Sequence, residues 1–153
     1  MAQQVQTIHF YSTHDEHGCF SNFSRHSIFL RGKRWRTSEH FFQAMKFQGT
    51  EHEEKVRLCK TPSQAADMGR SRKLPLRRDW ESVKDQVMLE AVRAKFTQHD
   101  DLRAALLATG DAVIVEHTEN DSYWGDGGDG SGKNRLGQIL MQVRELLRRG
   151  ETT

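Results

Sequence analysis

The segment SIFLRGKRWRTSEHFFQAMKFQG, residues 27–49, decides the fold class because its residue pattern changes within a few positions. Its first half favours two short strands, Ser27–Leu30 and Arg34–Trp35, with a turn between them at Gly32. Thr37 and Ser38 are then typical helix N-cap residues, and SEHFFQAMKFQG predicts a helix that ends near Gly49. A hairpin followed at once by a helix indicates an α+β fold.

The rest of the chain contributes more helix than strand. VQTIHFY at 5–11 and AVIVE at 112–116 favour strands. Helices are predicted over 51–59, from Thr61 until Gly69 closes the helix, from Asp79 to about 98, over 100–109, and from about 134 onward. The last of these carries apolar residues at i, i+3/i+4 spacing, which predicts a buried stripe. We expect one helix-rich α+β domain over residues 1–153, with its core at about 8–148, around a small, mainly antiparallel sheet.

Composition excludes several classes of protein. The chain has 153 residues, which fits one domain, and Lys+Arg 23 against Asp+Glu 21 gives a net charge of +2, which argues against a duplex-coating nucleic-acid binder. Cys19 and Cys59 are isolated, and the eight histidines lack ligand spacing, so we expect neither a disulfide scaffold nor a metal site. The N-terminus MAQQVQTIHF has no signal pattern and no apolar run reaches about 20 residues, so we expect a soluble, cytoplasmic protein without membrane contact.

One candidate site lies on the helix predicted after Thr37. Glu39, Gln43 and Lys46 stand at i, i+4 and i+7, so they project from one face of a helix that is otherwise aromatic. Such a stripe of carboxylate, amide and amine is typical of a site. On spacing alone the plainer interpretation is favoured, in which Glu39 complements the helix dipole and Lys46 is solvated.

A second candidate is the loop ENDSYWGDGGDGSGKN, residues 119–134, whose glycines allow close approach to a ligand and whose N–H groups suit an anion. Its G-x-x-x-x-G-K stretch is followed by Asn134 where a P-loop needs Ser or Thr, and the calcium-loop alternation of acidic residues is absent, so we reject both interpretations. A flexible linker is the structural alternative, which Tyr123 and Trp124 disfavour.

Two smaller features complete the set. A basic loop at 70–78, with Arg70 and Arg72, precedes Trp80, and this combination suits a ligand that carries a phosphate and a ring. A solvated charge run beside a core Trp explains it equally well. Phe20-Ser21-Asn22-Phe23 places an amide between two aromatic residues, which is weak evidence by itself.

Four segments together resemble the YbiA-like N-glycosidases of the NADAR superfamily. They are FSNF (20–23), TSEHFFQAMKF (37–47), MGRSRKLPLRRDWESVKDQVM (68–88) and EHTENDSYWGDGGDGSGKNRLG (116–137). The resemblance runs from about residue 8 to 148. It implies hydrolysis of the C–N glycosidic bond of early riboflavin-pathway intermediates, the ribosylamino-pyrimidine 5′-phosphates, to ribose 5-phosphate and the free pyrimidine. That reaction removes reactive amines, a damage pre-emption role.

Other branches of the superfamily leave two alternatives open. One is an ADP-ribosyl glycohydrolase that removes ADP-ribose from guanine bases of nucleic acid, and the other is a non-catalytic sensor of ADP-ribose or NAD. None of these functions requires a metal or a redox cofactor, and no obligate protein partner is expected.

The resemblance also implies a set of site residues. It ties activity to Glu39, Trp80, Asp121 and Asp126. Because breaking a ribosyl C–N bond develops positive charge on the sugar, we expect Glu39 or Asp126 to stabilise that charge, with Lys46 as an alternative nucleophile. The substrate-binding residues that we expect are Asn22, Phe20, Gln43, Arg70, Arg72, Trp80, Asp121, Tyr123, Trp124, Gly125, Lys133 and Asn134.

Overall fold

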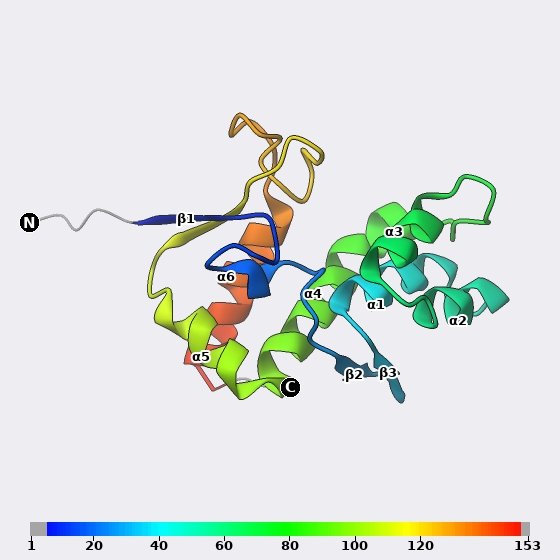
Figure 1. Ribbon diagram of the computed structural model, residues 1–153, viewed down its shortest axis with the longest axis horizontal. Coiled ribbons are helices and arrows are strands. Elements are labelled where there is room, and N and C mark those ends of the chain that lie inside the picture. The colour runs from blue at the N-terminus through cyan, green and yellow to red at the C-terminus, as the bar shows by residue number, and fades with distance from the viewer. Residues whose placement is uncertain (1–5, 151–153) are drawn as a thin grey trace, which may run out of the picture. The chain divides into compact units, whose positions relative to one another are not determined.

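The computed structural model describes residues 6–150, which form two compact units (Figure 1). Unit 1 comprises the described parts of Met1–Ser21 and His99–Thr153, and unit 2 is Asn22–Gln98. Six α-helices, two short 3-10 helices and four strands occur in this described part of the chain.

Unit 2 begins with the expected hairpin. Strands β2 (Ile28–Leu30) and β3 (Lys33–Trp35) pair antiparallel, with Ile28 opposite Trp35. Arg31 and Gly32 join them with φ of 55° and 78°. Two consecutive positive φ angles match the right-handed twist of the flanking strands, and glycine adopts one of them without strain.

Helices make up the rest of unit 2. They are α1 (Ser38–Ala44), the 3-10 helix η2 (Met45–Phe47), α2 (Glu51–Arg57), α3 (Pro62–Arg70) and α4 (Trp80–Gln98). Helix α1 packs against α2, α3 and α4, so it is the central helix of this unit. The ring of Trp35 meets that of Phe41 edge to face at 5.2 Å, and both rings are buried. The aromatic positions of α1 therefore build the core that holds its polar face in place.

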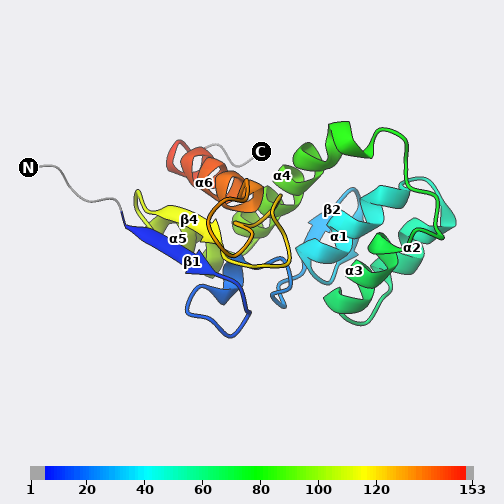
Figure 2. The ribbon, with the colours of Figure 1, turned by 90° about the horizontal axis from the view of Figure 1, so that it is seen from above.

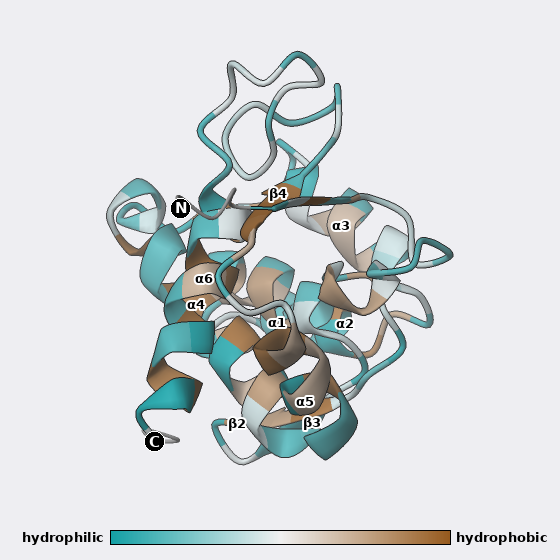
Figure 3. Ribbon diagram, turned by 90° about the vertical axis from the view of Figure 1, so that its left-hand side faces the viewer, coloured by the Kyte–Doolittle hydropathy of each residue, from teal (hydrophilic) through white to brown (hydrophobic). Residues whose placement is uncertain are grey.

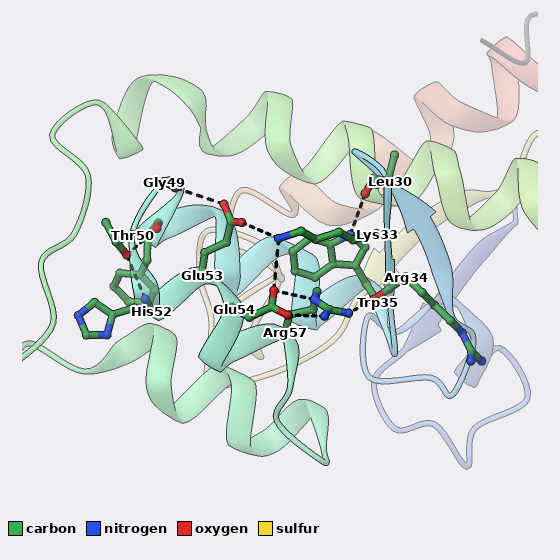
Figure 4. A network of polar contacts seen from close by, with 11 residues as sticks. Leu30, Lys33, Arg34, Trp35, Gly49, Thr50, His52, Glu53, Glu54 and Arg57 are labelled. Carbon is green, nitrogen blue, oxygen red and sulfur yellow. Dashed lines mark hydrogen bonds and ion pairs between the residues drawn. The ribbon is translucent and has the colours of Figure 1, made fainter.

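An ion-pair cluster fastens the hairpin to α2 (Figure 4). Lys33 Nζ lies 3.3 Å from Glu54 and 3.6 Å from Glu53, and Arg57 also binds Glu54. Trp35 Nε1 donates to the carbonyl of Leu30 in the same view. The hydrogen bond from Arg57 holds the pKa of Glu54 at about 2, against the effect of its burial. These ion pairs connect Lys33 of β3 to α2, two residues before the buried Trp35.

Unit 1 contains a parallel strand pair. Strand β1 (Thr7–Phe10) lies beside β4 (Val113–Glu116) in parallel register, Thr7 opposite Val113 (Figure 2). Helix α6 (Arg135–Arg148) packs on β4 and on α5 (Asp100–Ala108), and the short helix η1 spans Gly18–Phe20. Of the apolar stripe of α6, Leu136, Ile139, Leu140, Val143 and Leu147 are buried. Leu146 is half-buried, and Arg144 is buried instead, donating to the carbonyl of Ala112 at 2.8 Å.

The helix-rich α+β class is confirmed, and two details differ from expectation. The single, mainly antiparallel sheet is instead two separate pairs, of which β1–β4 is parallel. Since about a hundred residues separate those strands, the chain has the long crossover that parallel pairing requires. Gly69 does not close α3, because the helix continues to Arg70 and Gly69 keeps a negative φ. Within residues 6–150, no helix is both long and apolar enough to span a bilayer.

Candidate functional site

The polar face of α1 is buried. Glu39 is 7% exposed and Gln43 3%, and Gln43 Nε2 donates to Glu39 Oε1 at 3.0 Å. Glu39 lies in the first turn of α1, as the plainer interpretation requires, but Lys46 is half-buried and not the solvated side chain that this interpretation expects. Burial of a carboxylate costs free energy unless hydrogen bonds compensate, so a fold keeps such a group where its charge is used.

Lys46, which belongs to η2, lies near the Glu39 carboxylate of α1. Its Nζ donates to the carbonyl of Gly69 at 3.1 Å and lies 5.8 Å from the ring centroids of Phe42 and of Trp80. Burial lowers the pKa of the Lys46 amine, and the negative charge of Glu39 opposes that shift. A partly desolvated amine is a better nucleophile near neutral pH than an exposed lysine.

The residues around the start of α1 determine where that helix begins, and thereby the position of Glu39 in its first turn. Thr37 caps the helix by accepting from the N–H of His40. The buried His40 ring donates from Nε2 to the carbonyl of Cys59 at 2.9 Å, and burial lowers its pKa. The Glu39 N–H donates to the carbonyl of Asn22, whose side-chain oxygen accepts from Ser38 at 2.8 Å. Asn22, which was expected to bind substrate, thus helps to position Glu39 through these hydrogen bonds.

A cavity of about 300 Å³ opens beside Lys46 in unit 2. Trp80 lines it, and the Trp80 ring packs edge to face on Phe42 at 5.1 Å. Arg70 and Arg72 line the same cavity with exposed side chains. The other lining residues are Phe47, Gly69, Ser71, Leu74 and Leu76. One amine, one indole and two guanidinium groups thus meet at a single concave surface, the size of which suits a small ligand.

Asp126 organises the glycine-rich loop of unit 1, drawn in teal and white above β4 in Figure 3. Its carboxylate accepts from His117 Nδ1 at 2.8 Å and from the N–H groups of Thr118 and Gly128 at 3.1 and 2.9 Å. Burial raises the pKa of Asp126, but these hydrogen bonds outweigh it and hold the pKa at about 2. The carboxylate is therefore ionised at neutral pH and spends most of its hydrogen-bonding capacity within the loop.

Further internal bonds make the loop an ordered structure, so the linker interpretation is wrong. Asp121 Oδ1 accepts from the N–H groups of Tyr123 and Trp124 at 2.9 and 2.8 Å. A Cβ on Gly125 would lie 2.6 Å from Thr118. Asn134 donates to the Ile114 carbonyl and accepts from the Glu116 N–H, which ties the loop to β4.

Several loop N–H groups that were expected to bind an anion donate hydrogen bonds within the loop instead. Gly127, Gly128, Gly132 and Lys133 all donate their backbone N–H to oxygens of the loop itself. The loop also contains a side-chain cluster of half-buried Tyr123 and Trp124 with exposed Lys133. The rings of Tyr123 and Trp124 meet edge to face at 4.8 Å, and Lys133 Nζ lies 5.5 Å from the Tyr123 centroid.

The remaining expected residue, Phe20, lies in the core of unit 1. It is 1% exposed, and its ring packs edge to face on Phe10 at 5.9 Å. The structure thus brings Glu39, Gln43, Lys46, Arg70, Arg72 and Trp80 into one unit, while the loop residues form a second group in unit 1.

Sequence reasoning missed two residues. His117 pairs with Asp126 although its position at the end of the β4 segment gave no signal. Gly69 was interpreted as the residue that ends a helix. Its close contact with the Gln43 side chain follows from the packing of α1 on α3, which the sequence alone does not show. Residues 6–150 contain no group of three or more His, Cys, Asp or Glu side chains arranged to hold a metal ion.

Comparison with known proteins adds independent findings. The model of the NADAR domain matches residues 9–148. The chain is 60% identical to N-glycosidase YbiA of Escherichia coli (strain K12) over 152 residues, 95% of each chain. It is 44% identical to riboflavin biosynthesis protein VVA0006 of Vibrio vulnificus over 142 residues, 93% of this chain and 39% of that protein. The NMR structure of the E. coli protein YbiA superposes with a TM-score of 0.90 at 57% identity, covering 98% of this chain and 89% of that one.

Proposed function

Because the chain belongs to the NADAR domain family, we propose that it is an N-glycosidase acting on early riboflavin-biosynthesis intermediates. The substrates are ribosylamino-pyrimidine 5′-phosphates, and the products are ribose 5-phosphate and the free pyrimidine. The observation that carries the proposal is the partly desolvated Lys46 amine, which lines an open cavity, together with the buried Glu39 carboxylate, whose charge acts on that amine.

The carboxylate of Glu39 stabilises the sugar as the bond breaks. When C1′ loses its bond to the pyrimidine amine, positive charge spreads over C1′ and the ring oxygen. A carboxylate fixed in a water-poor surrounding before the reaction stabilises that charge without reorganising. Water then adds its oxygen to C1′, and the amine leaves with a proton.

Lys46 offers a second route to the same products. Its neutral amine attacks C1′ while the pyrimidine amine departs, and the ribose ring opens to give an iminium between Nζ and C1′. Water then adds to C1′, the C1′–Nζ bond breaks and ribose 5-phosphate is released. The two routes differ in one observable, because borohydride reduces the iminium to a stable secondary amine.

The cavity supplies recognition. Arg70 and Arg72 would hold the 5′-phosphate, since a guanidinium can donate two parallel hydrogen bonds to phosphate oxygens. Trp80 would contact the pyrimidine ring. In unit 1, we propose Asp121, Tyr123, Trp124, Gly125, Lys133 and Asn134 as further substrate-binding residues. Asp126 is the alternative candidate for the charge-stabilising carboxylate, and its hydrogen bonds also hold the loop.

The proposal extends to the role and setting of the enzyme. Removal of unstable ribosylamines before they react elsewhere is a damage pre-emption function, located in the cytoplasm where these intermediates would arise. We also propose that residues 1–153 act as one domain, so that both units unfold in a single transition.

The decisive experiment measures release of ribose 5-phosphate from freshly prepared 5-amino-6-ribosylaminouracil 5′-phosphate. Parallel reactions contain ADP-ribosylated single-stranded DNA, or ADP-ribose and NAD. We expect release from the pyrimidine. If ADP-ribose is released from DNA and the pyrimidine is untouched, the enzyme is an ADP-ribosyl glycohydrolase; binding of ADP-ribose or NAD without any turnover would make it a sensor.

Borohydride trapping separates the two routes. Reaction mixtures are reduced during turnover, and intact mass is compared for the wild type, Lys46→Arg and the exposed-lysine control Lys60→Arg. An adduct in the wild type and the control but not in Lys46→Arg establishes the iminium. Turnover by the wild type without any adduct establishes direct attack by water.

A further inference from the structure

Gly69 is the second-to-last residue of α3, which ends at Arg70. Its backbone is helical and so does not require glycine. A Cβ built at this position would lie 1.9 Å from Gln43 Oε1 and 2.6 Å from Gln43 Cδ. The absence of a side chain therefore provides the space that the Gln43 amide fills.

The amide of Gln43 is held in one orientation by Glu39. A carboxylate accepts hydrogen bonds, so Nε2 must face Glu39 and Oε1 must face Gly69. In that position Oε1 is buried and finds no hydrogen-bond partner among residues 6–150. The orientation of the Gln43 amide is therefore set by its bond to Glu39 and by the space beside Gly69.

The other side of Gly69 contacts the amine. Its carbonyl accepts from Lys46 Nζ at 3.1 Å. Gly69 thus contacts Lys46 directly through its carbonyl. It affects Glu39 indirectly, because it makes room for the Gln43 amide that binds the Glu39 carboxylate. The charged groups that act on Lys46 are Glu39 itself, Arg70 of α3, and Glu81 and Lys84 of α4.

We propose that Gly69 and Gln43 are positioning residues that hold the Glu39 carboxylate and the Lys46 amine in their reactive arrangement. This inference rests on the proposed N-glycosidase function and adds to it two residues that act through Glu39 and Lys46. Gln43 thereby acts on the enzyme's own carboxylate, where a direct contact with the substrate was expected.

The test is a double-mutant cycle of Gly69→Ala and Gln43→Ala, with the exposed α3 variant Asp67→Ala as control. Gly69→Ala should lower kcat at least tenfold, because its Cβ displaces the amide. In the Gln43→Ala background the same substitution should change kcat less than twofold, since no amide remains to be displaced. The pH–kcat profile should shift in both single variants, because Gln43 fixes the position of the Glu39 charge that acts on the pKa of Lys46. Asp67→Ala should match the wild type.

The same cycle is followed by urea unfolding, which does not depend on activity. Gly69→Ala should lower the midpoint in the wild-type background and leave it equal or higher in the Gln43→Ala background. Wild-type kcat and pH profile in Gly69→Ala, or equal effects in both backgrounds, would overturn the inference. A wild-type enzyme that releases no ribose 5-phosphate defeats the proposed function instead, and the unfolding cycle still decides whether Gly69 makes room for Gln43.

Discussion

Replacing Asp126 with asparagine tests how the glycine-rich loop is held. The substitution keeps the shape of the side chain but removes the charge that accepts from His117, Thr118 and Gly128. Its Oδ1 can still accept from the two backbone groups, while the amide nitrogen faces the imidazole. The loop therefore loses charge-assisted bonds without losing volume.

The size of the effect follows from the pKa of Asp126, which lies at about 2 against an ordinary 3.8. Each pKa unit corresponds to about 1.4 kcal/mol, so ionised Asp126 contributes about 2 kcal/mol to the free energy of unfolding at neutral pH. Because the folded pKa is lowered, this contribution is present above the unfolded pKa and is lost as pH falls toward 2. At pH 3 roughly half of it remains.

Urea unfolding followed by tryptophan fluorescence at pH 7, 5, 4 and 3 measures this contribution. The free energy difference between the wild type and Asp126→Asn should be about 2 kcal/mol at pH 7 and 5 and should shrink by roughly half at pH 3. Glu119→Gln, an exposed carboxylate of the same loop, is the control and should stay within about 0.5 kcal/mol of the wild type.

The reasoning is refuted if Asp126→Asn unfolds within about 0.5 kcal/mol of the wild type at pH 7. It is refuted equally if the difference is large but independent of pH, since a lost volume or a clash would behave in that way. A difference that grows toward low pH would contradict the sign of the pKa shift.

Three further predictions concern local features. Thr61→Ala should destabilise the protein by about 1 kcal/mol in urea unfolding, because Thr61 caps α3 by accepting from the Gln64 N–H; an unchanged midpoint would contradict this. Gly125→Ala should lower the thermal midpoint, since its Cβ meets Thr118 at 2.6 Å, and a rise of the midpoint would show that the loop relaxes freely. Arg72→Ala should raise KM about tenfold with little change in kcat for the phosphorylated substrate, and the same loss of affinity for the dephosphorylated substrate would remove Arg72 from phosphate binding.

Most of the element boundaries were predictable because they follow from local rules. Thr37 and Thr61 cap the helices that their positions predicted, and the turn at Gly32 has the positive φ that glycine permits. The helix predicted from Asp79 begins one residue later, at Trp80, and the Asp79 carboxylate binds Arg77 at 2.6 Å. Side-chain partners depend on neighbours from other elements and cannot be deduced from the position alone.

The candidate site was predictable in composition but not in arrangement. The i, i+4, i+7 spacing identified Glu39, Gln43 and Lys46, but burial of that face results from packing of α1 against three other helices. Gly69 shows the limit most clearly. A glycine near a helix end has two explanations, a turn or a close approach, and only the position of Gln43 distinguishes them.

The central claim is that the buried Glu39 carboxylate on α1 stabilises the positive charge that develops on the ribose as its C–N bond breaks. The most direct measurement is release of ribose 5-phosphate from 5-amino-6-ribosylaminouracil 5′-phosphate by the wild type, by Glu39→Gln and by the exposed control Glu51→Gln. Glutamine at 39 preserves the bond with Gln43, so the fold should be retained while turnover falls by roughly 100-fold or more. A folded Glu39→Gln enzyme that releases ribose 5-phosphate at the wild-type rate would contradict the account.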